Sequence, residues 1–209
     1  MQEPLRFNAP GPVAGIDEAG RGPLAGPVVA AAVILRDDDP IDGLADSKQL
    51  SAARRGELAT QIMARSLAWS VAWADPAEID RLNILQATLL AMRRAILGLQ
   101  VQPVQVEVDG NRLPNLDFHE RRIDGAAIVG GDTKVAAISA ASIIAKVRRD
   151  GIMHDMDCLY PQYGFGRHKG YATADHRSRL AEFGPCREHR RSFAPISSMN
   201  SGRGHDRPE

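Results

Sequence analysis

The stretch Ile16-Asp17-Glu18-Ala19-Gly20-Arg21-Gly22-Pro23 lies between two apolar runs that are expected to be strands, Val13–Asp17 and Val28–Leu35. Two adjacent carboxylates followed by an arginine have no evident purpose in a core, but they suit a metal-dependent site that handles phosphate. Two further acids, Asp109 and Asp132, lie at or just beyond the ends of later strand-like segments. Together the four acids predict a nuclease that uses two divalent metal ions.

Outside this stretch, strand-like and helix-like patterns alternate along the chain. Further strands are expected at Ser66–Ala74, Val104–Asp109 and Ala126–Val129, and helices at Ala52–Arg65, Pro76–Leu97, Thr133–Leu159 and Ala174–Phe183. The run Val28–Leu35 is continuously apolar, as expected of a strand covered on both faces. The order of elements predicts an α/β fold, a mixed sheet with helices on its faces.

The charge of the chain is balanced overall but unevenly distributed. The 26 basic and 26 acidic residues give a formal net charge of zero. Between Lys146 and Arg191, ten Lys and Arg residues face six Asp and Glu, with four His. A basic region beside an acidic site suits nucleic acid. Charge alone, however, favours an ordinary solvated helical face.

The two cysteines, Cys158 and Cys186, have no metal-binding spacing and are expected to be reduced. The N-terminus lacks the pattern of a signal peptide. The longest apolar run, Val28–Leu35, is too short to span a bilayer, so no membrane partner is expected. These features predict a cytoplasmic protein.

One domain is expected for 209 residues of this composition. Residues 1–11 are predicted to be a flexible lead-in, and residues 12–196 a single catalytic domain with a basic, helical C-terminal part. Residues 197–209 contain almost nothing apolar and are predicted to be a disordered tail.

Two segments near the acids could contact nucleic acid. The glycines of Gly20-Arg21-Gly22 would let the backbone approach a ribose 2′-OH, and Arg21 would bind a phosphate. The alternative is a plain hairpin turn. Lys48 precedes a predicted helix N-terminus and could hold a backbone phosphate, although a solvated loop lysine explains it equally well.

Further candidates lie in the last third of the chain. Ser142 and Lys146 are four residues apart and therefore share a helix face, although packing alone explains the alanines around them. The aromatic and basic loop from Tyr160 to Tyr171 also contains His168 and Lys169, and it suits sugar or base stacking beside phosphate contacts. The alternative is a surface loop held in place by its aromatic residues.

Five motifs resemble, in this order, those of ribonuclease HII, the type 2 ribonuclease H family. They are Gly15–Gly22, Asp46-Ser47-Lys48, Val108–Asn111, Gly131-Asp132 with Ser142–Val147, and His168–Tyr171. The resemblance implies an RNase H-like fold with a mixed five-stranded sheet, flanked by helices and followed by a helical C-terminal region. It also implies that Asp17, Glu18, Asp109 and Asp132 are the catalytic, metal-binding acids. Ala172 stands where the family frequently has proline.

The resemblance further implies what these residues do. Gly20, Arg21 and Gly22 would contact the 2′-OH, and Tyr171 would stack on the sugar at an RNA–DNA junction. The expected activity is endonucleolytic hydrolysis of the RNA strand in RNA–DNA hybrids, and incision at ribonucleotides embedded in duplex DNA, leaving 3′-hydroxyl and 5′-phosphate ends. The expected cofactors are two Mg²⁺ or Mn²⁺ ions. A monomer is expected, and no glutamine-led aromatic tail for a sliding clamp is seen.

Two other functions remain to be weighed. A catalytically silent nucleic-acid binder would have no use for four mutually repelling carboxylates. A DNA nuclease or transposase-like strand-transfer enzyme of related fold would have no use for groups that recognise a 2′-OH, so Gly20-Arg21-Gly22 and Tyr171 favour the ribonuclease.

Overall fold

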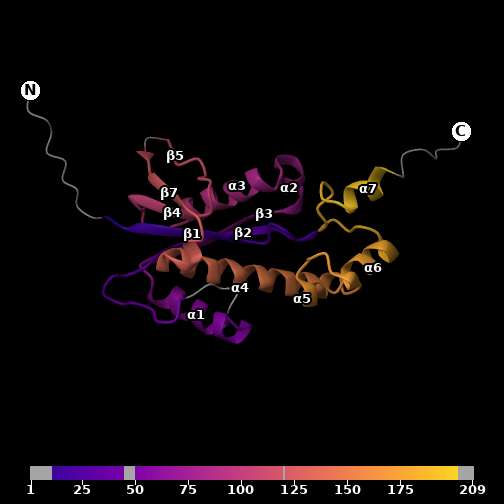
Figure 1. Cartoon of the computed structure of the whole chain (residues 1–209), viewed down its shortest axis with the longest axis horizontal. Helices are drawn as coiled ribbons and strands as arrows, with labels where there is room; N and C mark the ends of the chain where they lie inside the picture. The colour runs from indigo at the N-terminus through magenta and orange to yellow at the C-terminus, as the bar shows by residue number, and fades with distance from the viewer. Residues whose placement is uncertain (1–10, 45–49, 120, 202–209) are drawn as a thin grey trace, which may run out of the picture.

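A five-stranded mixed sheet forms the centre of the computed structural model, which describes residues 11–44, 50–119 and 121–201 (Figure 1). The strand order is β3-β2-β1-β4-β7. Their bounds are β1 Val13–Ala19, β2 Val28–Ile34, β3 Ala68–Ala74, β4 Gln105–Asp109 and β7 Asp124–Ile128. The β1–β2 and β2–β3 pairs are antiparallel, whereas β4 is parallel to both β1 and β7. The predicted mixed α/β sheet is confirmed.

Helices cover both faces of the sheet. In Figure 1, α2 and α3 lie on one face and α4 on the other, with α1 packed outside α4. The bounds are α1 Ala52–Arg65, α2 Pro76–Leu82, α3 Ile84–Leu97, α4 Ala136–Leu159, α5 Phe165–His168, α6 Ala174–Phe183 and α7 Ile196–Ser201. The last three form a helical region beyond one end of the sheet.

Strand β2 is buried along its whole length, as its unbroken apolar run predicts. Successive side chains of a strand point to opposite faces. Ala30 and Ala32 therefore join the core beneath α3, and Ala31 and Val33 join the core beneath α1 and α4. The two cores hold β1 at the middle of the sheet, where its C-terminal end can meet that of β4.

Helix α4 packs unusually close to β1. A Cβ placed on Gly15 would lie 2.1 Å from the carbonyl carbon of Ala137, which leaves no room for a side chain. Ala140 and Ala141 are fully buried along the same helix. The small residues of α4 thus let this helix approach the sheet, and the approach brings Ser142 beside the C-terminal part of β1.

Two of the predicted helices have different bounds. The single helix expected over Pro76–Leu97 is wrong, because Asn83 adopts a positive φ of 68° and separates α2 from α3. Its side chain accepts a hydrogen bond from the N–H of Gln86 at 3.1 Å and so caps α3. The helix expected from Thr133 begins at Ala136, after the 3₁₀ turn η1, Gly131–Thr133.

Three short elements were not expected from the sequence. The strands β5, Asp117–Phe118, and β6, Arg121–Arg122, form a small hairpin, and α5 lies within the aromatic loop. Helix α7 extends into the segment that was predicted to be disordered. Its Ile196 is fully buried with Leu24 and Leu180, and Met199 packs on them. Residues 1–10 and 202–209 lie outside the described part of the chain. Within the described ranges, no helix is long and apolar enough to cross a membrane.

Candidate active site

The C-terminal ends of β1 and β4 meet α4 around a cavity of about 220 Å³. The parallel register pairs Ile16 with Val108, so the next residues, Asp17 and Asp109, lie side by side on the face that α4 covers. The cavity is lined by Asp17, Glu18, Ala19, Gly20, Arg21, Asp109, Ser142, Lys146, Arg149 and Tyr171. Residues that are far apart in the sequence thus line one cavity.

Burial and neighbouring acids raise the pKa of Asp17 and of Glu18. Burial raises the pKa of the Asp17 carboxyl well above its ordinary value, and repulsion from Glu18 and Asp109 raises it further. Hydrogen bonds from Ser142 and from the Glu18 N–H, at 2.7 Å, oppose that rise. Burial also raises the pKa of Glu18, against the attraction of Arg21. Without a cation, the charged forms of Asp17 and Glu18 are therefore disfavoured.

Asp132 lies just beyond this group. It is buried in the turn η1, 7% exposed, and is not among the residues that line the cavity. The turn is tied to the cavity by the Gly131 N–H, which donates to Oδ1 of Asp109 at 2.7 Å. The structure therefore brings Asp17, Glu18 and Asp109 together around the cavity. Asp132 lies outside it, in the turn that is hydrogen-bonded to Asp109.

The donors around the cavity fit a hard divalent cation. Carboxylate oxygens are the ligands that Mg²⁺ and Mn²⁺ prefer, and a bound cation would relieve the repulsion that raises the pKa of Asp17. In the described part of the chain, no three His, Cys, Asp or Glu side chains are already placed to hold one ion.

The Gly20-Arg21-Gly22 segment and Tyr171 form the other wall of the cavity. Gly20 has a φ of +94°, and a Cβ there would lie 1.8 Å from Nε of Arg149, so only glycine fits. A Cβ on Gly22 would lie 3.9 Å from the Tyr171 ring, so that ring lies close beside the segment. The ring is 47% exposed and faces the cavity beside the acids.

The sequence model of the family described as Ribonuclease HII matches residues 14–196.

The chain belongs to the ribonuclease HII family.

Known proteins similar to it support this assignment. Ribonuclease HII of Paracidovorax citrulli (strain AAC00-1) is 60% identical over 197 residues, which cover 94% of this chain and 80% of that protein. The ribonuclease H2 structure from Pyrococcus horikoshii OT3 matches with a TM-score of 0.76 and 26% identity, over 91% of this chain and 98% of that one. The PCNA:RNase HII complex from Archaeoglobus fulgidus matches with a TM-score of 0.72 and 29% identity, over 87% and 95%. This member of the ribonuclease HII family is therefore a nuclease and a ribonuclease H enzyme, and the expected RNase H-like fold is confirmed.

The remaining residues that were predicted to contact nucleic acid differ in their neighbours. Lys146 lines the cavity and pairs with Asp150 at 2.7 Å. His168 and Lys169 are partly buried, and both contact their own loop: His168 bonds the Tyr163 carbonyl and the Gly170 N–H, and the Lys169 ammonium bonds the Gly166 carbonyl. These two side chains therefore hold the loop that carries Tyr171. Lys48 lies outside the described residues.

Two buried arginines support the cavity and were not anticipated. Arg149 donates to the carbonyls of Ala25, Pro27 and Lys169. It lies seven residues after Ser142 and three after Lys146, so helical spacing could have identified it. Arg190 offers no such signal, because its partners Gly20 and Arg21 lie 170 and 169 residues away.

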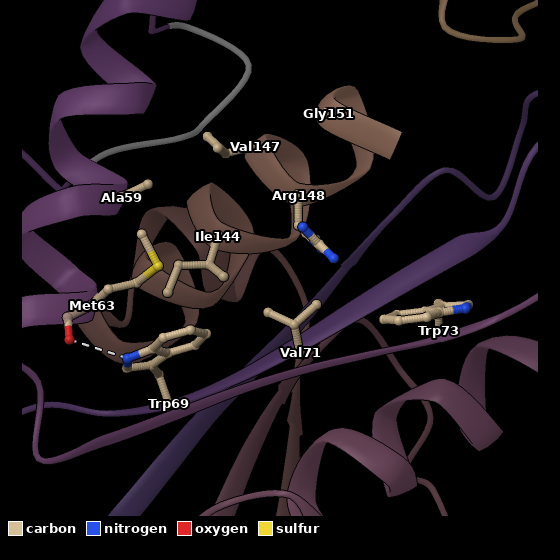
Figure 2. A pocket seen from close by; sticks show the side chains of 9 residues that line it. All are labelled: Ala59, Met63, Trp69, Val71, Trp73, Ile144, Val147, Arg148 and Gly151. Atoms are coloured by element: carbon tan, nitrogen blue, oxygen red, sulfur yellow. Dashed lines mark hydrogen bonds between the residues drawn. The ribbon is translucent and has the colours of Figure 1, made fainter. Parts of the chain in front are cut away.

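A larger groove lies away from the acids, between α1, α4 and the edge strand β3 (Figure 2). It has a volume of about 430 Å³ and is lined mainly by apolar side chains, including Met63, Trp69, Val71, Trp73 and Ile144. Arg148 is its one charged lining residue. Since no carboxylate lines it, this groove lacks the groups needed for phosphodiester chemistry.

Two histidines near Tyr171, His176 and His189, are buried. Their burial makes the free energy of unfolding depend on pH. Burial and, to a smaller extent, the neighbouring His176 lower the pKa of His189 from 6.5 to about 4. Between pH 6.5 and 4, His189 is therefore protonated in the unfolded chain but neutral in the folded protein. The contribution of His189 to stability is complete above pH 6.5 and is lost as the pH falls to 4, by at most about 3 kcal/mol.

We expect the stability difference between the wild type and His189→Gln to shrink as the pH falls from 6.5 to 4. Urea unfolding at intervals across this window measures it. His154→Gln, which changes an exposed histidine of α4, should follow the wild type at every pH. Parallel profiles for the wild type and His189→Gln would show that protonation of His189 does not affect folding.

Proposed function

We propose that this enzyme hydrolyses the RNA strand of RNA–DNA hybrids and also incises duplex DNA at single embedded ribonucleotides. The observation that supports this most is the composition of one cavity. It holds Asp17, Glu18 and Asp109 directly beside Gly20 and Tyr171. Acids that can bind metal thus lie next to backbone and aromatic groups that suit a ribose.

The backbone of the Gly20-Arg21-Gly22 segment has a fixed orientation that supports recognition of a 2′-OH. Arg190 donates to the carbonyls of Gly20 and Arg21. Because C=O and N–H point in opposite directions in a trans peptide, the N–H groups of Arg21 and Gly22 point away from Arg190. A 2′-OH both donates and accepts hydrogen bonds, so these N–H groups can bind its oxygen.

The acids and basic groups would share the remaining work. Asp17, Glu18, Asp109 and Asp132 would hold two Mg²⁺ or Mn²⁺ ions. When bound, such ions lower the pKa of a water and stabilise charge on the attacking and leaving oxygens. Arg21 and Lys146 would bind backbone phosphates, as would Lys48, and Ser142 would orient Asp17. His168 and Lys169 would shape the substrate contact of the Tyr171 loop.

The proposed reaction leaves defined ends. A water attacks phosphorus in line and gives up a proton, while the bond from phosphorus to the 3′ oxygen breaks and that oxygen takes up a proton. The products are a 3′-hydroxyl and a 5′-phosphate. We further propose that the enzyme is a cytoplasmic monomer, and no sliding-clamp partner forms part of this proposal.

Cleavage of three duplexes of one sequence tests the proposed function. The first is all DNA, the second carries one embedded ribonucleotide, and the third has a continuous RNA strand. We expect Mg²⁺- or Mn²⁺-dependent cleavage of the second and third only. Binding without cleavage would indicate a silent binder, and cleavage of the all-DNA duplex would indicate a nuclease that ignores the 2′-OH.

Tyr171→Ala should impair cleavage at a single ribonucleotide much more than cleavage of a continuous hybrid. The ring lies beside Gly22, where it can pack against the sugar that follows the ribonucleotide. An additional hydroxyl on that sugar would crowd the ring, so the contact favours deoxyribose. Loss of such an interaction costs on the order of 1–3 kcal/mol, or roughly ten- to a hundredfold in the ratio of kcat/KM values.

Steady-state kinetics on the two substrates measure this ratio. Trp73→Ala is the matched control, because Trp73 is an aromatic residue of similar exposure, 45%, in the remote groove. It should leave the ratio unchanged. An equal fall on both substrates for Tyr171→Ala would mean that the ring supports general binding only.

Lys146→Ala should weaken binding to duplexes of any sequence and reduce the salt dependence of binding by about one unit of log–log slope. The Lys146 ammonium lines the cavity, and its pairing with Asp150 is partly exposed and therefore weak. Fluorescence anisotropy at salt concentrations from about 50 to about 200 mM measures the slope. An unchanged slope would exclude a phosphate contact by Lys146.

A further inference from the structure

The loop that carries Tyr171 packs on a cluster of three histidines, His168, His176 and His189. The rings of His168 and His176 are stacked with centroids 4.3 Å apart, and the ring of Phe165 contacts all three. His176 and His189 are almost completely buried, at 0% and 1% exposure. Neither residue reaches the cavity that holds the acids.

The hydrogen bonds of this cluster have one consistent direction. Nδ1 of His176 lies 2.9 Å from the Tyr171 carbonyl oxygen, which can only accept, so Nδ1 carries the proton. In a neutral ring, Nε2 of His176 must then accept, and it does so from Nε2 of His189 at 3.1 Å. This leaves Nδ1 of His189 as an acceptor, and the Cys186 N–H donates to it at 3.1 Å.

Both imidazoles must be neutral for this arrangement, and their burial keeps them so. Burial lowers the pKa of both rings, that of His189 to about 4. A row of three hydrogen bonds therefore runs from the backbone of Cys186 through both rings to the backbone of Tyr171. One neutral tautomer of each ring satisfies all three hydrogen bonds, so the donor and the acceptor of each bond are fixed.

The Tyr171 carbonyl is the last acceptor of this row, and the backbone around it needs support. Lys169 and Gly170 both have positive φ, 52° and 81°, which is unfavourable for the lysine. The Tyr171 N–H donates to the His168 carbonyl at 2.9 Å, and its carbonyl also accepts from Thr173 at 2.8 Å. Because the ring is half exposed, its position depends on the backbone that carries it.

We propose that His176 and His189 are positioning residues that fix the Tyr171 backbone and thereby set the preference for a single embedded ribonucleotide. This inference rests on the proposed function of Tyr171. The two histidines touch neither substrate nor metal. They act by holding the Tyr171 ring at the distance from Gly22 that lets it pack on one sugar.

The experiment compares substitutions of His176 that differ in one donor. In His176→Asn, the amide nitrogen can take the place of Nδ1 and still donate to Tyr171. In His176→Gln, the amide lies further out and loses that bond while keeping polarity. His176→Leu removes both bonds. We expect the ratio of kcat/KM for the single ribonucleotide to that for the continuous hybrid to fall about tenfold in the Leu and Gln variants, the size of one lost hydrogen bond. The Asn variant should retain most of the ratio.

Combination with Tyr171→Ala separates positioning from general support. If His176 acts through Tyr171, adding His176→Gln to Tyr171→Ala should change the ratio no further, because the two effects are not additive. A purely structural histidine would lower activity on both substrates equally, and additively with Tyr171→Ala. Either of those results, or a ratio that is equal in the Asn and Gln variants, would overturn the inference.

The same data separate this inference from the proposed function. If Tyr171→Ala itself leaves the ratio unchanged, the proposed role of Tyr171 fails and the positioning role fails with it. If Tyr171→Ala lowers the ratio and His176→Gln does not, only the positioning role fails. Circular dichroism confirms that each variant is folded. Should His176→Leu be unfolded, the Asn and Gln variants still decide the question, and His154→Gln again serves as the control.

Discussion

Asp17→Asn should lower kcat on the continuous RNA–DNA hybrid by on the order of a thousandfold, equivalent to about 4 kcal/mol of transition-state stabilisation. Asp17 is the carboxylate that Glu18, Asp109 and Ser142 surround most closely. A neutral amide is a poor ligand for a hard cation and cannot balance its charge. Single-turnover cleavage in Mg²⁺ and in Mn²⁺ measures the loss. Full activity of the variant, or of the wild type in chelator, would contradict a mechanism that uses metal ions.

The same substitution should have the opposite effect on stability. Burial and the acidic neighbours raise the pKa of Asp17, so its charged form destabilises the folded protein, and Asn removes that charge. We expect Asp17→Asn to unfold at a higher temperature than the wild type when no divalent ion is present. Added Mg²⁺ should stabilise the wild type and not the variant. Asp155→Asn, at an exposed position on α4, should change neither property.

Arg190→Met should produce the largest loss of stability, about 3–5 kcal/mol. Arg190 is completely buried, and its guanidinium donates to the carbonyls of Gly20, Arg21 and Gly26 at 2.5, 2.8 and 3.0 Å. Methionine has no hydrogen-bond donor in its side chain. All three carbonyls therefore lose a donor in the variant. Each buried, unsatisfied group costs on the order of 1–3 kcal/mol. Urea denaturation measures the difference in the free energy of unfolding.

Two further variants identify the cause of that loss. Arg190→Lys keeps the charge but cannot reach three carbonyls with one ammonium, so it should recover only part of the stability. Arg187→Met removes an arginine whose side chain is 83% exposed and should be nearly neutral. A loss as small for Arg190→Met as for Arg187→Met would show that these three bonds contribute little.

The acids could be predicted from the sequence because local patterns place them. Asp17 lies two residues before the end of β1 and Asp109 is the last residue of β4, and parallel neighbouring strands bring such ends together. The expectation for β2 also held, since a strand covered on both faces has an unbroken apolar run. The prediction of one continuous helix was wrong because of a single backbone dihedral angle. The positive φ of Asn83 ends α2, although the apolar spacing continues without a break into α3.

The support of the cavity could not be predicted, because it depends on contacts between distant segments. Nothing near Arg190 in the sequence indicates that its side chain lies beneath Gly20 and Arg21. The same holds for the row of bonds from Cys186 to Tyr171, which exists only after α6 and the following turn have packed together. His168 illustrates the difficulty: its sequence neighbours suggest a phosphate contact, whereas its two ring nitrogens bond the backbone of its own loop.

The bonds from Arg190 to Gly20 and Arg21 also impose an order on biosynthesis. The ribosome makes the acids of β1 long before Arg190, and domains begin to fold while synthesis continues. A nascent chain can therefore form its sheet and bring its carboxylates together before the Gly20-Arg21-Gly22 segment has its final shape. The partly made enzyme would hold its metal-binding acids without the means to select a substrate. We therefore expect the final shape of Gly20-Arg21-Gly22 to require the segment that carries Arg190.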